Sequence, residues 1–230
     1  MAASRGEALA HRFFSGTGTT YDVMVNLGTI GFDRWWKKKI VGRIPAAPRR
    51  ILDQACGTGI LTFQIARRFP LCRIVGVELR EEYVLIARAK AAARHPNNVD
   101  FIIGRAEDVF LNTGFDCITS SYLAKYAEIG KLVQNAKRML RDGGLLIVHD
   151  FTYPPGRRFA RLWEFYFRLL QTAGSRQYPE WRTVFYELPQ LLRCTGWVDE
   201  LIETLQKNAF ADITLDPLTW GTSALITARR

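Results

Sequence analysis

Ile51-Leu-Asp-Gln-Ala-Cys-Gly-Thr-Gly59 is the stretch that decides the fold of this chain. It opens with a short apolar run that is typical of a buried strand, and the run ends at Asp53. Gly57 and Gly59 permit a sharp backbone turn and leave no side chain between the main chain and a ligand. The segment after the turn repeats an apolar residue at every fourth position, which predicts a helix. A strand, a glycine turn and a helix predict a nucleotide-type pocket at the carboxyl end of a parallel strand.

The competing interpretation of this turn is a dinucleotide-binding fold. The motif G-x-G-x-x-G would require glycine at position 62, where the chain has Thr62. S-adenosylmethionine has no phosphate to seat at the helix N-terminus, and Asp53 suits its ammonium and sulfonium charges. Glu78 ends the next apolar run, and a carboxylate at that place holds ribose hydroxyls in both folds. The pattern therefore favours an S-adenosylmethionine pocket, with S-adenosylhomocysteine as the product, over an ordinary strand-to-helix turn.

Size and composition indicate one globular domain with an unusual charge. The chain has 230 residues, of which 48% are hydrophobic and 23% charged, so it can bury a sizeable core. Its net charge is +10 and its isoelectric point is near 9.7. This charge indicates an anionic partner, either a membrane surface, a nucleic acid or an acidic substrate, unless it only forms a solvated basic surface.

Targeting signals and cysteine usage indicate a cytoplasmic protein. The first ten residues lack the long apolar stretch of a secretory signal, and no run approaches the ~18 apolar residues of a membrane span. Peripheral attachment to a membrane surface is compatible with both observations. The cysteines are scattered and are expected to be free thiols: Cys56, Cys72, Cys117 and Cys194. The histidines show no metal-ligand spacing, so no metal site is expected: His11, His95 and His149.

Strand and helix signals alternate along the chain, which predicts an α/β fold. After the first strand, further strands are expected at residues 73–78, 99–103, 115–120, 145–150, 211–216 and 222–228. Helices are expected between them, including 81–94 and 129–140. Right-handed crossovers then give a doubly wound, seven-stranded, mostly parallel sheet of the Rossmann-like type. The pocket is expected at the carboxyl ends of the first, second and fourth strands.

We divide the single expected domain, residues 1–230, into four parts. Residues 1–48 form an N-terminal helical cover, 49–151 the cofactor-binding core, 152–208 a helical lid and 209–230 a closing strand pair. Residues 159–170 are so rich in aromatic side chains that a helix there needs two covered faces, either as a substrate lid or as additional core. Trp35 and Trp36 beside a lysine run indicate either a lipid interface or a helix with one tryptophan in the core.

Several further motifs lie in order along the chain. They are Tyr21-Asp22, Thr29-Ile-Gly31, Arg34-Trp-Trp36, Ala106-Glu107, Phe115-Asp116, Arg138-Met-Leu-Arg-Asp-Gly-Gly144 and Leu218-Thr-Trp-Gly221. With the cofactor turn, they make the chain resemble class I methyltransferases and, more closely, the ubiquinone/menaquinone biosynthesis C-methyltransferase family. The resemblance extends over nearly the full length. It implies an S-adenosylmethionine-dependent methyltransferase that acts on a quinone precursor.

Positions that match the motifs of this family give the expected cofactor site. The resemblance implies that Thr58, Glu78, Arg105, Ala106 and Ser121 line the cofactor. The full expected set is Asp53, Gly57, Thr58, Gly59, Glu78, Leu79, Arg105, Ala106, Glu107 and Ser121. Arg105 is a departure, because the family has Asp or Asn there and a guanidinium cannot accept a hydrogen bond from the adenine amine.

The chain departs from the family at three other places. Ile60 follows the turn where the family has Asp, and Val25 stands where it has Asn. The family's Arg-Asn pair after the fourth strand is replaced by Lys125-Tyr126. These changes leave the methyltransferase interpretation intact and bear on the identity of the acceptor.

Methyl transfer to a ring carbon defines what the catalytic residues must do. An in-line displacement depends mainly on positioning, and a phenolic ring becomes a carbon nucleophile when its hydroxyl loses a proton. The candidate bases are Asp150 and His149 at the end of the fifth strand and Tyr21 and Asp22 in the cover. Asp150 is best placed by topology. The structural alternatives are packing for Tyr21, a helix cap for Asp22 and a buried core position for His149.

Three classes of function fit these observations. A quinone precursor, or another small aromatic or lipid-like acceptor, is favoured by the resemblance and by the aromatic lid. RNA is favoured only by the net charge, since the chain has no recognisable RNA-binding module. A catalytically inactive homologue that binds S-adenosylmethionine is the third class, and Arg105 is the reason to consider it. The oligomeric state is not indicated by the sequence.

Overall fold

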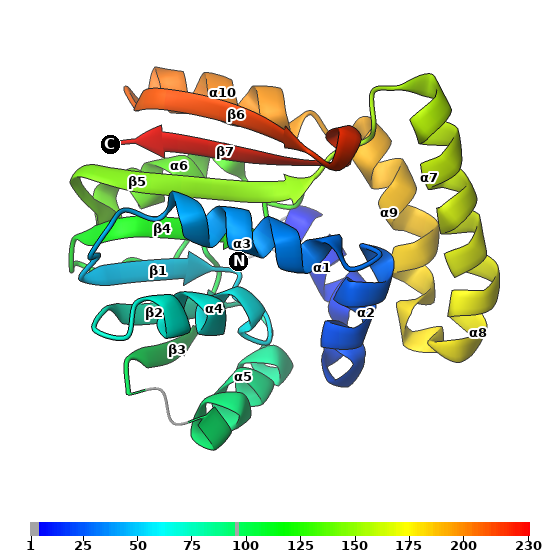
Figure 1. Ribbon diagram of the computed structural model, residues 1–230, viewed down its shortest axis with the longest axis horizontal. Coiled ribbons are helices and arrows are strands. Elements are labelled where there is room, and N and C mark those ends of the chain that lie inside the picture. Colours follow the sequence, from blue (N-terminus) through cyan, green and yellow to red (C-terminus); the bar gives the residue numbers. More distant parts are fainter. Residues whose placement is uncertain (1–4, 95–96) are drawn as a thin grey trace.

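A seven-stranded sheet forms the centre of the computed structural model, which describes residues 5–94 and 97–230 (Figure 1). The strand order is β3-β2-β1-β4-β5-β7-β6, and β7 runs antiparallel to β5 and β6. The strands are β1 (Arg50–Gln54), β2 (Arg73–Glu78), β3 (Val99–Ile103), β4 (Phe115–Ser121), β5 (Leu140–Phe151), β6 (Ala211–Leu218) and β7 (Ser223–Arg229). The predicted doubly wound, mostly parallel sheet is confirmed. His95 lies outside the described residues.

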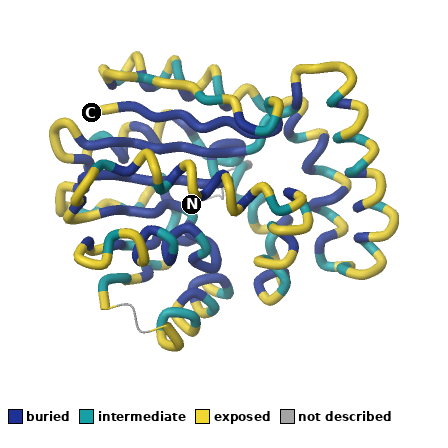
Figure 2. The backbone as a smooth tube through the Cα atoms, viewed as in Figure 1, coloured by how far each residue is buried: buried dark blue, intermediate teal, exposed yellow. Residues whose placement is uncertain are grey.

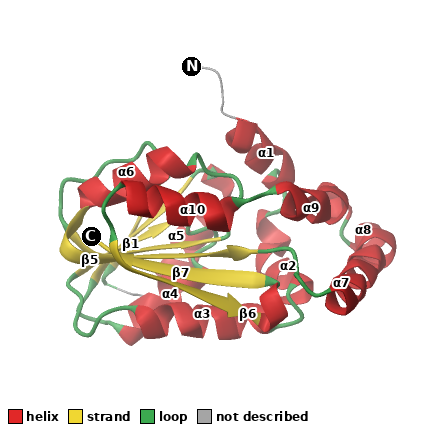
Figure 3. Ribbon diagram, turned by 90° about the horizontal axis from the view of Figure 1, so that it is seen from above, coloured by secondary structure: helices red, strands yellow, loops and turns green. Residues whose placement is uncertain are grey.

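Helices cover both faces of this sheet. The α-helices of the described residues are α1 (Arg5–Phe14), α2 (Tyr21–Gly28), α3 (Phe32–Arg43), α4 (Ile60–Arg68), α5 (Glu81–Arg94), α6 (Ile129–Met139), α7 (Arg157–Leu169), α8 (Ser175–Gln177), α9 (Arg182–Cys194) and α10 (Trp197–Lys207). α3 and α4 pack on one face, and α6 and α10 pack on the other (Figure 3). α2, α7, α8 and α9 lie beyond the carboxyl ends of the parallel strands (Figure 1).

Successive residues of a strand point to opposite faces of the sheet. Because helices cover both faces, the central strands are buried on both sides (Figure 2). Ile51, Cys117 and Ile147 belong to the hydrophobic cluster with α3 and α4. Leu52 and Ile118 belong to the cluster with α6 and α10. Full burial of one large aliphatic side chain contributes about 1.5–3 kcal/mol. This alternation fixes the register that brings the ends of β1, β2 and β4 together.

The N-terminal cover and the lid share a hydrophobic cluster of their own. Phe13 of α1 and Met24 of α2 belong to it, together with Phe167 of α7 and with Phe185 and Leu188 of α9. These helices are not layered on the sheet. They enclose the space beyond the carboxyl ends of its strands, where the pocket was expected.

The last helix of the expected lid packs elsewhere. α10 places Trp197, Leu201 and Leu205 in the same buried cluster as α6. The Trp197 indole N–H also donates a 2.7 Å hydrogen bond to the carbonyl of Phe151. Residues 152–208 are therefore divided, with α7 to α9 beside the pocket and α10 in the layer on the sheet, because the apolar face of α10 matches that of α6.

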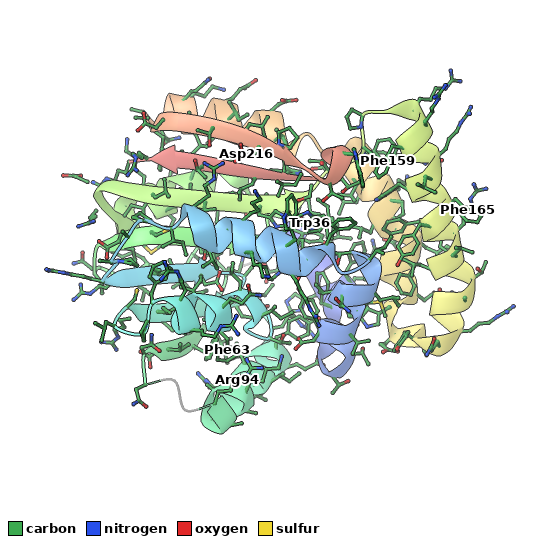
Figure 4. All side chains as sticks on the ribbon, in the orientation of Figure 1. Trp36, Phe63, Arg94, Phe159, Phe165 and Asp216 are labelled. Carbon is green, nitrogen blue, oxygen red and sulfur yellow. The ribbon has the colours of Figure 1, made fainter. Side chains whose placement is uncertain are left out.

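The two neighbouring tryptophans of α3 differ in environment. Trp36 is in the core (Figure 4), and its indole N–H donates a 2.7 Å hydrogen bond to the Thr219 hydroxyl. Trp35 is exposed. Cys56, Cys72 and Cys117 are buried free thiols. Among the described helices, none is long and apolar enough to span a membrane.

Candidate active site

The glycine turn after β1 has the tight backbone geometry that its sequence predicts. Gly57 and Gly59 have φ angles of 57° and 85°, in the left-handed region that favours glycine. Ala55 is also left-handed, with φ of 54°. A Cβ added at Gly57 would lie 3.6 Å from the ring of Tyr21. The cover therefore contacts the turn directly.

Glu78 lies at the end of β2 beside the turn. Its carboxylate accepts hydrogen bonds from the backbone N–H groups of Gly57 and Arg80, both at 2.9 Å. Burial raises the pKa of Glu78, and the backbone donors oppose this shift. A buried carboxylate at this place fits the role of holding the ribose hydroxyls of a nucleoside.

Asp53, at the other side of the turn, is engaged by two hydroxyl groups. Thr62 of α4 donates at 2.6 Å and Thr119 of β4 donates at 2.8 Å. Burial raises the pKa of Asp53 to about 6, against the lowering effect of these bonds. Thr62, which stands where the dinucleotide motif needs glycine, thus ties α4 to β1. Asp53 of β1 is therefore hydrogen-bonded to both α4 and β4, and this structural role is separate from a contact with a ligand.

Arg105 lies inside a group of four carboxylates. Its guanidinium nitrogens are 3.1 Å from Glu128, 3.3 Å from Asp108, 3.5 Å from Glu7 and 3.8 Å from Glu107. Glu7 belongs to α1, so this group connects the cover to the loops after β3 and β4. Sequence reasoning did not find this connection, because Glu7 and Glu128 are distant from Arg105 in the chain.

Two small cavities flank the turn. One, of about 40 Å³, is bordered by Leu79, Arg105, Ala106 and Glu107 together with residues of α1. The other, of about 20 Å³, is bordered by Asp53 and Ser121. Several of the expected cofactor residues thus gather in small spaces beside the turn. Residues of the cover border the same spaces, among them Glu7 of α1 and Tyr21 of α2.

The cover is also fastened to the turn by a polar contact. The Thr58 hydroxyl, at the middle of the turn, donates a hydrogen bond to Asp22 of α2. The ammonium of Lys90, on α5, is 2.6 Å from the same carboxylate. Above the turn, Tyr21 packs against Tyr83 and Trp181, with ring centroids 4.9 and 6.0 Å apart.

The two candidate bases of β5 are engaged with protein groups. Asp150 pairs with the Lys125 ammonium at 2.6 Å and accepts backbone N–H bonds from Lys125 and Phe151. His149 lies between the hydroxyls of Ser121 and Ser223, at 3.1 and 2.6 Å. Burial, with the nearby ammonium groups, lowers the pKa of His149 well below its ordinary value. His149 is therefore a neutral, hydrogen-bonded core residue.

An apolar pocket of about 270 Å³ lies between the cover and the lid, and Tyr21, whose ring faces Gly57 of the turn, is part of its wall. Aromatic side chains from every part of the chain line it, among them Phe14, Trp36, Tyr122, Phe151, Trp163 and Trp181. Of the four candidate catalytic residues, only Tyr21 belongs to this lining. The aromatic content of residues 159–170 was the sequence signal for this pocket.

One charged side chain on the pocket wall replaces the Arg of the family's Arg-Asn pair. The Lys125 ammonium lies 4.4 Å from the ring centroid of Tyr126 and 5.5 Å from that of Phe151. Burial lowers its pKa, and the ion pair with Asp150 opposes that shift. Lys125 thus brings a buried positive charge to an otherwise apolar pocket.

A second buried charge pair was missed by sequence reasoning. Asp33 and Lys37 form an ion pair within α3, and the Tyr122 hydroxyl donates to Asp33 at 2.6 Å. Asp33 and Lys37 are each 3% exposed, although Lys37 begins a run of three lysines. The i, i+4 spacing of the two residues was the one signal that could have indicated the pair.

The strand order, the glycine turn and the carboxylate after β2 define a class I, S-adenosylmethionine-dependent methyltransferase. Solved structures share this fold. The phosphoethanolamine N-methyltransferase 2 of Haemonchus contortus, solved with phosphomonomethylethanolamine and S-adenosylhomocysteine, has a TM-score of 0.71 at 14% identity, covering 100% of this chain and 61% of that one. A putative methyltransferase of Methanococcus maripaludis has a TM-score of 0.67 at 14% identity, covering 94% and 93%.

The chain belongs to the ubiE/COQ5 methyltransferase family, whose model matches residues 2–229. It is 30% identical over 216 residues to a demethylmenaquinone methyltransferase of Thermus thermophilus, covering 92% of this chain and 97% of that protein. It is also 30% identical over 177 residues to a ubiquinone/menaquinone biosynthesis C-methyltransferase of Geotalea daltonii, covering 74% and 75%. The predicted family, enzyme class and cofactor are confirmed.

Proposed function

We propose that this enzyme transfers a methyl group from S-adenosylmethionine to a ring carbon of a quinone precursor of the menaquinone or ubiquinone type. The observation that carries the proposal is the aromatic pocket of about 270 Å³, whose wall includes Tyr21, the residue that packs against Gly57 of the cofactor turn. Its walls suit a flat, apolar ring, since aromatic side chains stack on such rings and exclude water. The names of the relatives, demethylmenaquinone methyltransferase and ubiquinone/menaquinone biosynthesis C-methyltransferase, support the same acceptor class.

The cofactor supplies an electrophilic methyl group, and the chain's own residues prepare the acceptor. The aromatic walls hold the ring beside the turn, so that positioning provides much of the catalysis. The Lys125 ammonium favours an anionic oxygen on the ring, because a charge in a water-poor site acts strongly on a developing negative charge. Glu78 and the turn from Gly57 to Gly59 form the cofactor side of the site.

The mouth of the pocket supports an acceptor that stays in a membrane. Ile30, Leu162 and Trp220 line the pocket and are 66%, 60% and 71% exposed. Exposed apolar side chains around an apolar pocket are typical of a surface that meets a membrane or another protein. Arg158 and Arg161 are exposed on α7, the helix that carries Leu162, and their charge complements anionic lipids. The protein then works in the cytoplasm as a peripheral membrane enzyme on a lipid-tailed substrate.

The proposal is tested with purified protein, methyl-labelled S-adenosylmethionine and demethylmenaquinol in detergent micelles. Transfer of one label to the quinol ring, located by mass spectrometry, is the expected result. Label on oxygen would contradict carbon methylation, and no transfer with cofactor bound would favour an inactive homologue. A deletion strain should in addition accumulate the unmethylated quinone. An unchanged quinone profile would leave another small aromatic or lipid-like acceptor as the better assignment.

A further inference from the structure

Tyr122 occupies the junction between the two halves of the site. It follows β4 directly, at the carboxyl edge of the sheet. Its side chain lines both the apolar pocket and the small cavity that Asp53 and Ser121 border. A ring placed in the pocket and directed toward the cofactor therefore passes Tyr122.

The backbone holds Tyr122 there in a strained conformation. Its φ angle is 70°, in the left-handed region that a bulky residue rarely adopts. Such a conformation is strained and persists only where the surroundings enforce it. A 2.8 Å hydrogen bond from its N–H to the carbonyl of His149 and a stacked contact with Phe151, at 4.6 Å, do so here. The left-handed backbone at Tyr122 gives its phenol a different direction from the one that it would have if β4 continued.

The hydroxyl of Tyr122 meets a buried carboxylate. It donates to Asp33 at 2.6 Å, and Asp33 is held by the ammonium of Lys37 one helical turn away. An ionised carboxylate accepts hydrogen bonds only, so the proton between the two oxygens belongs to Tyr122. The phenol oxygen can then accept a second hydrogen bond from a hydroxyl group in the pocket.

Resting on the proposed function, we infer that Tyr122 is a catalytic residue that removes the proton from the acceptor's ring hydroxyl, with Asp33 as the final proton acceptor and Lys37 as a positioning residue. The O–H bond of the acceptor breaks, and its proton goes to the Tyr122 oxygen. At the same time the Tyr122 O–H bond breaks, and its proton goes to Asp33. The electron pair left on the acceptor oxygen makes the neighbouring ring carbon nucleophilic.

The proton is returned by the same route after methylation. Once the ring carbon carries the methyl group, it loses its own proton to water and the ring regains its aromatic character. The proton on Asp33 then passes back through Tyr122 to the ring oxygen. The net reaction releases one proton to solvent, as carbon methylation by a sulfonium requires.

Other titratable groups face this cluster and are already engaged. Asp150 is paired with Lys125, and His149 lies between two serine hydroxyls. Asp53 accepts from two threonine hydroxyls. Tyr21 faces it from α2, and burial raises the pKa of both phenols, Tyr21 and Tyr122, well above the ordinary value. Asp33 differs from these groups because its proton donor, Tyr122, lines the acceptor pocket itself.

The competing role for Tyr122, Asp33 and Lys37 is purely structural, as a polar link between α3 and the sheet. A binding measurement separates the two roles without turnover. In the presence of S-adenosylhomocysteine, wild-type protein should bind 1-naphthol at least about tenfold more tightly than 1-methoxynaphthalene, because only the first can donate to Tyr122. Tyr122→Phe keeps the ring and should remove this preference. No preference in the wild type, or the same preference in Tyr122→Phe, overturns the inference.

Turnover of demethylmenaquinol provides the second readout. Tyr122→Phe should lower kcat by about 10²-fold or more with little change in KM, since general acid–base catalysis contributes about 10²–10⁴-fold. Tyr186→Phe is the matched control, because Tyr186 lies outside the pocket lining and donates only to a lid carbonyl. A lowered melting temperature with unchanged kcat would show a structural role and overturn the inference.

A neutral double variant tests Asp33 separately. Asp33→Asn with Lys37→Met keeps the shape and leaves no unpaired charge, and the amide oxygen can still accept the Tyr122 hydrogen bond. The naphthol preference should persist while kcat falls, since an amide does not take the proton. Wild-type turnover in this variant would overturn the role of Asp33. If the wild type shows the naphthol preference but does not methylate demethylmenaquinol, the quinone proposal fails while the role of Tyr122 stands.

Discussion

The carboxylate of Asp22 in α2 accepts a hydrogen bond from the hydroxyl of Thr58, the central residue of the cofactor turn. The same carboxylate pairs with Lys90 of α5 at 2.6 Å. The N-terminal cover is thereby fastened to the turn at which the cofactor is expected to bind. We expect the cover to open when the cofactor enters, at a rate that depends on this contact.

Loosening this contact should accelerate exchange of the cofactor. Asp22→Ala removes one hydrogen bond and one partly exposed ion pair, which contribute about 0.5–1.5 and 0.2–1 kcal/mol. We expect the association and dissociation rate constants of S-adenosylhomocysteine to rise about three- to tenfold in stopped-flow fluorescence. Asp199→Ala, on α10, is the control and should leave both unchanged. Unaltered rates for Asp22→Ala would mean that the cover opens without breaking this contact.

Glu78, at the end of β2, should control cofactor affinity more than any side chain of the turn itself. Its charge-assisted hydrogen bonds to the ribose hydroxyls are worth about 1.5–3 kcal/mol each. Glu78→Ala should therefore weaken binding of S-adenosylmethionine at least about tenfold in calorimetry. It should also lower stability somewhat, because the backbone N–H of Gly57 loses its acceptor. A folded Glu78→Ala protein with wild-type affinity would remove this residue from the site.

Asp53 should make the protein less stable as the pH rises from about 4 to about 6. Its pKa is 3.8 when exposed and about 6 when folded, so the folded state binds the proton more tightly in this window. The free energy of unfolding falls wherever the folded state holds more protons. At 1.36 kcal/mol per pKa unit, this shift lowers the free energy of unfolding by about 3 kcal/mol, and the destabilisation is complete above about pH 6. Asp53→Asn should flatten this part of the pH profile in urea unfolding, and an identical slope in both proteins would contradict the assignment.

Local sequence patterns predicted the sheet well because each strand carries its own signal. β2 and β3 have the predicted bounds, and Glu78 lies at the end of β2 as expected. The contact between Asp33 and Tyr122 was not predictable, since the two residues are 89 positions apart and neither belongs to a motif with a known role. The partners of His149 and Asp150 likewise depend on which strands and loops meet after folding.

The division of the lid shows the same limit. α7 and α10 are both amphipathic helices of one connecting segment, so periodicity alone does not say which layer each joins. The answer depends on the complementary surfaces, with α10 on α6 and α7 beside α9. Sequence predicted that aromatic helices lie near the pocket and left open whether α7 is a buried lid. In the structure its Phe167 is buried, while Phe165 is 52% exposed and points away from the body (Figure 4).

The exposed face of α7 is the reason to expect binding to anionic membranes. Leu162, Phe165 and Leu169 are exposed on this helix. Arginines are exposed beside them, at positions Arg157, Arg158, Arg161 and Arg168. Each basic residue near an anionic bilayer contributes about 1 kcal/mol, and this attraction is screened by salt. The helix lies at the end of the molecule opposite the C-terminus (Figure 1).

Reversal of Arg157, Arg158 and Arg161 to Glu should therefore abolish binding to anionic vesicles in a sedimentation assay. Wild-type protein should bind such vesicles in a salt-sensitive manner and should not bind neutral ones. The variant should keep its cofactor affinity and lose activity on a vesicle-embedded demethylmenaquinol. Reversal of Arg50, Arg73 and Arg230 changes the net charge equally at the opposite edge of the sheet, so this control should retain vesicle binding. If both variants lost vesicle binding equally, total charge rather than α7 would govern binding. Full activity of the α7 variant on the embedded acceptor would contradict docking through this helix.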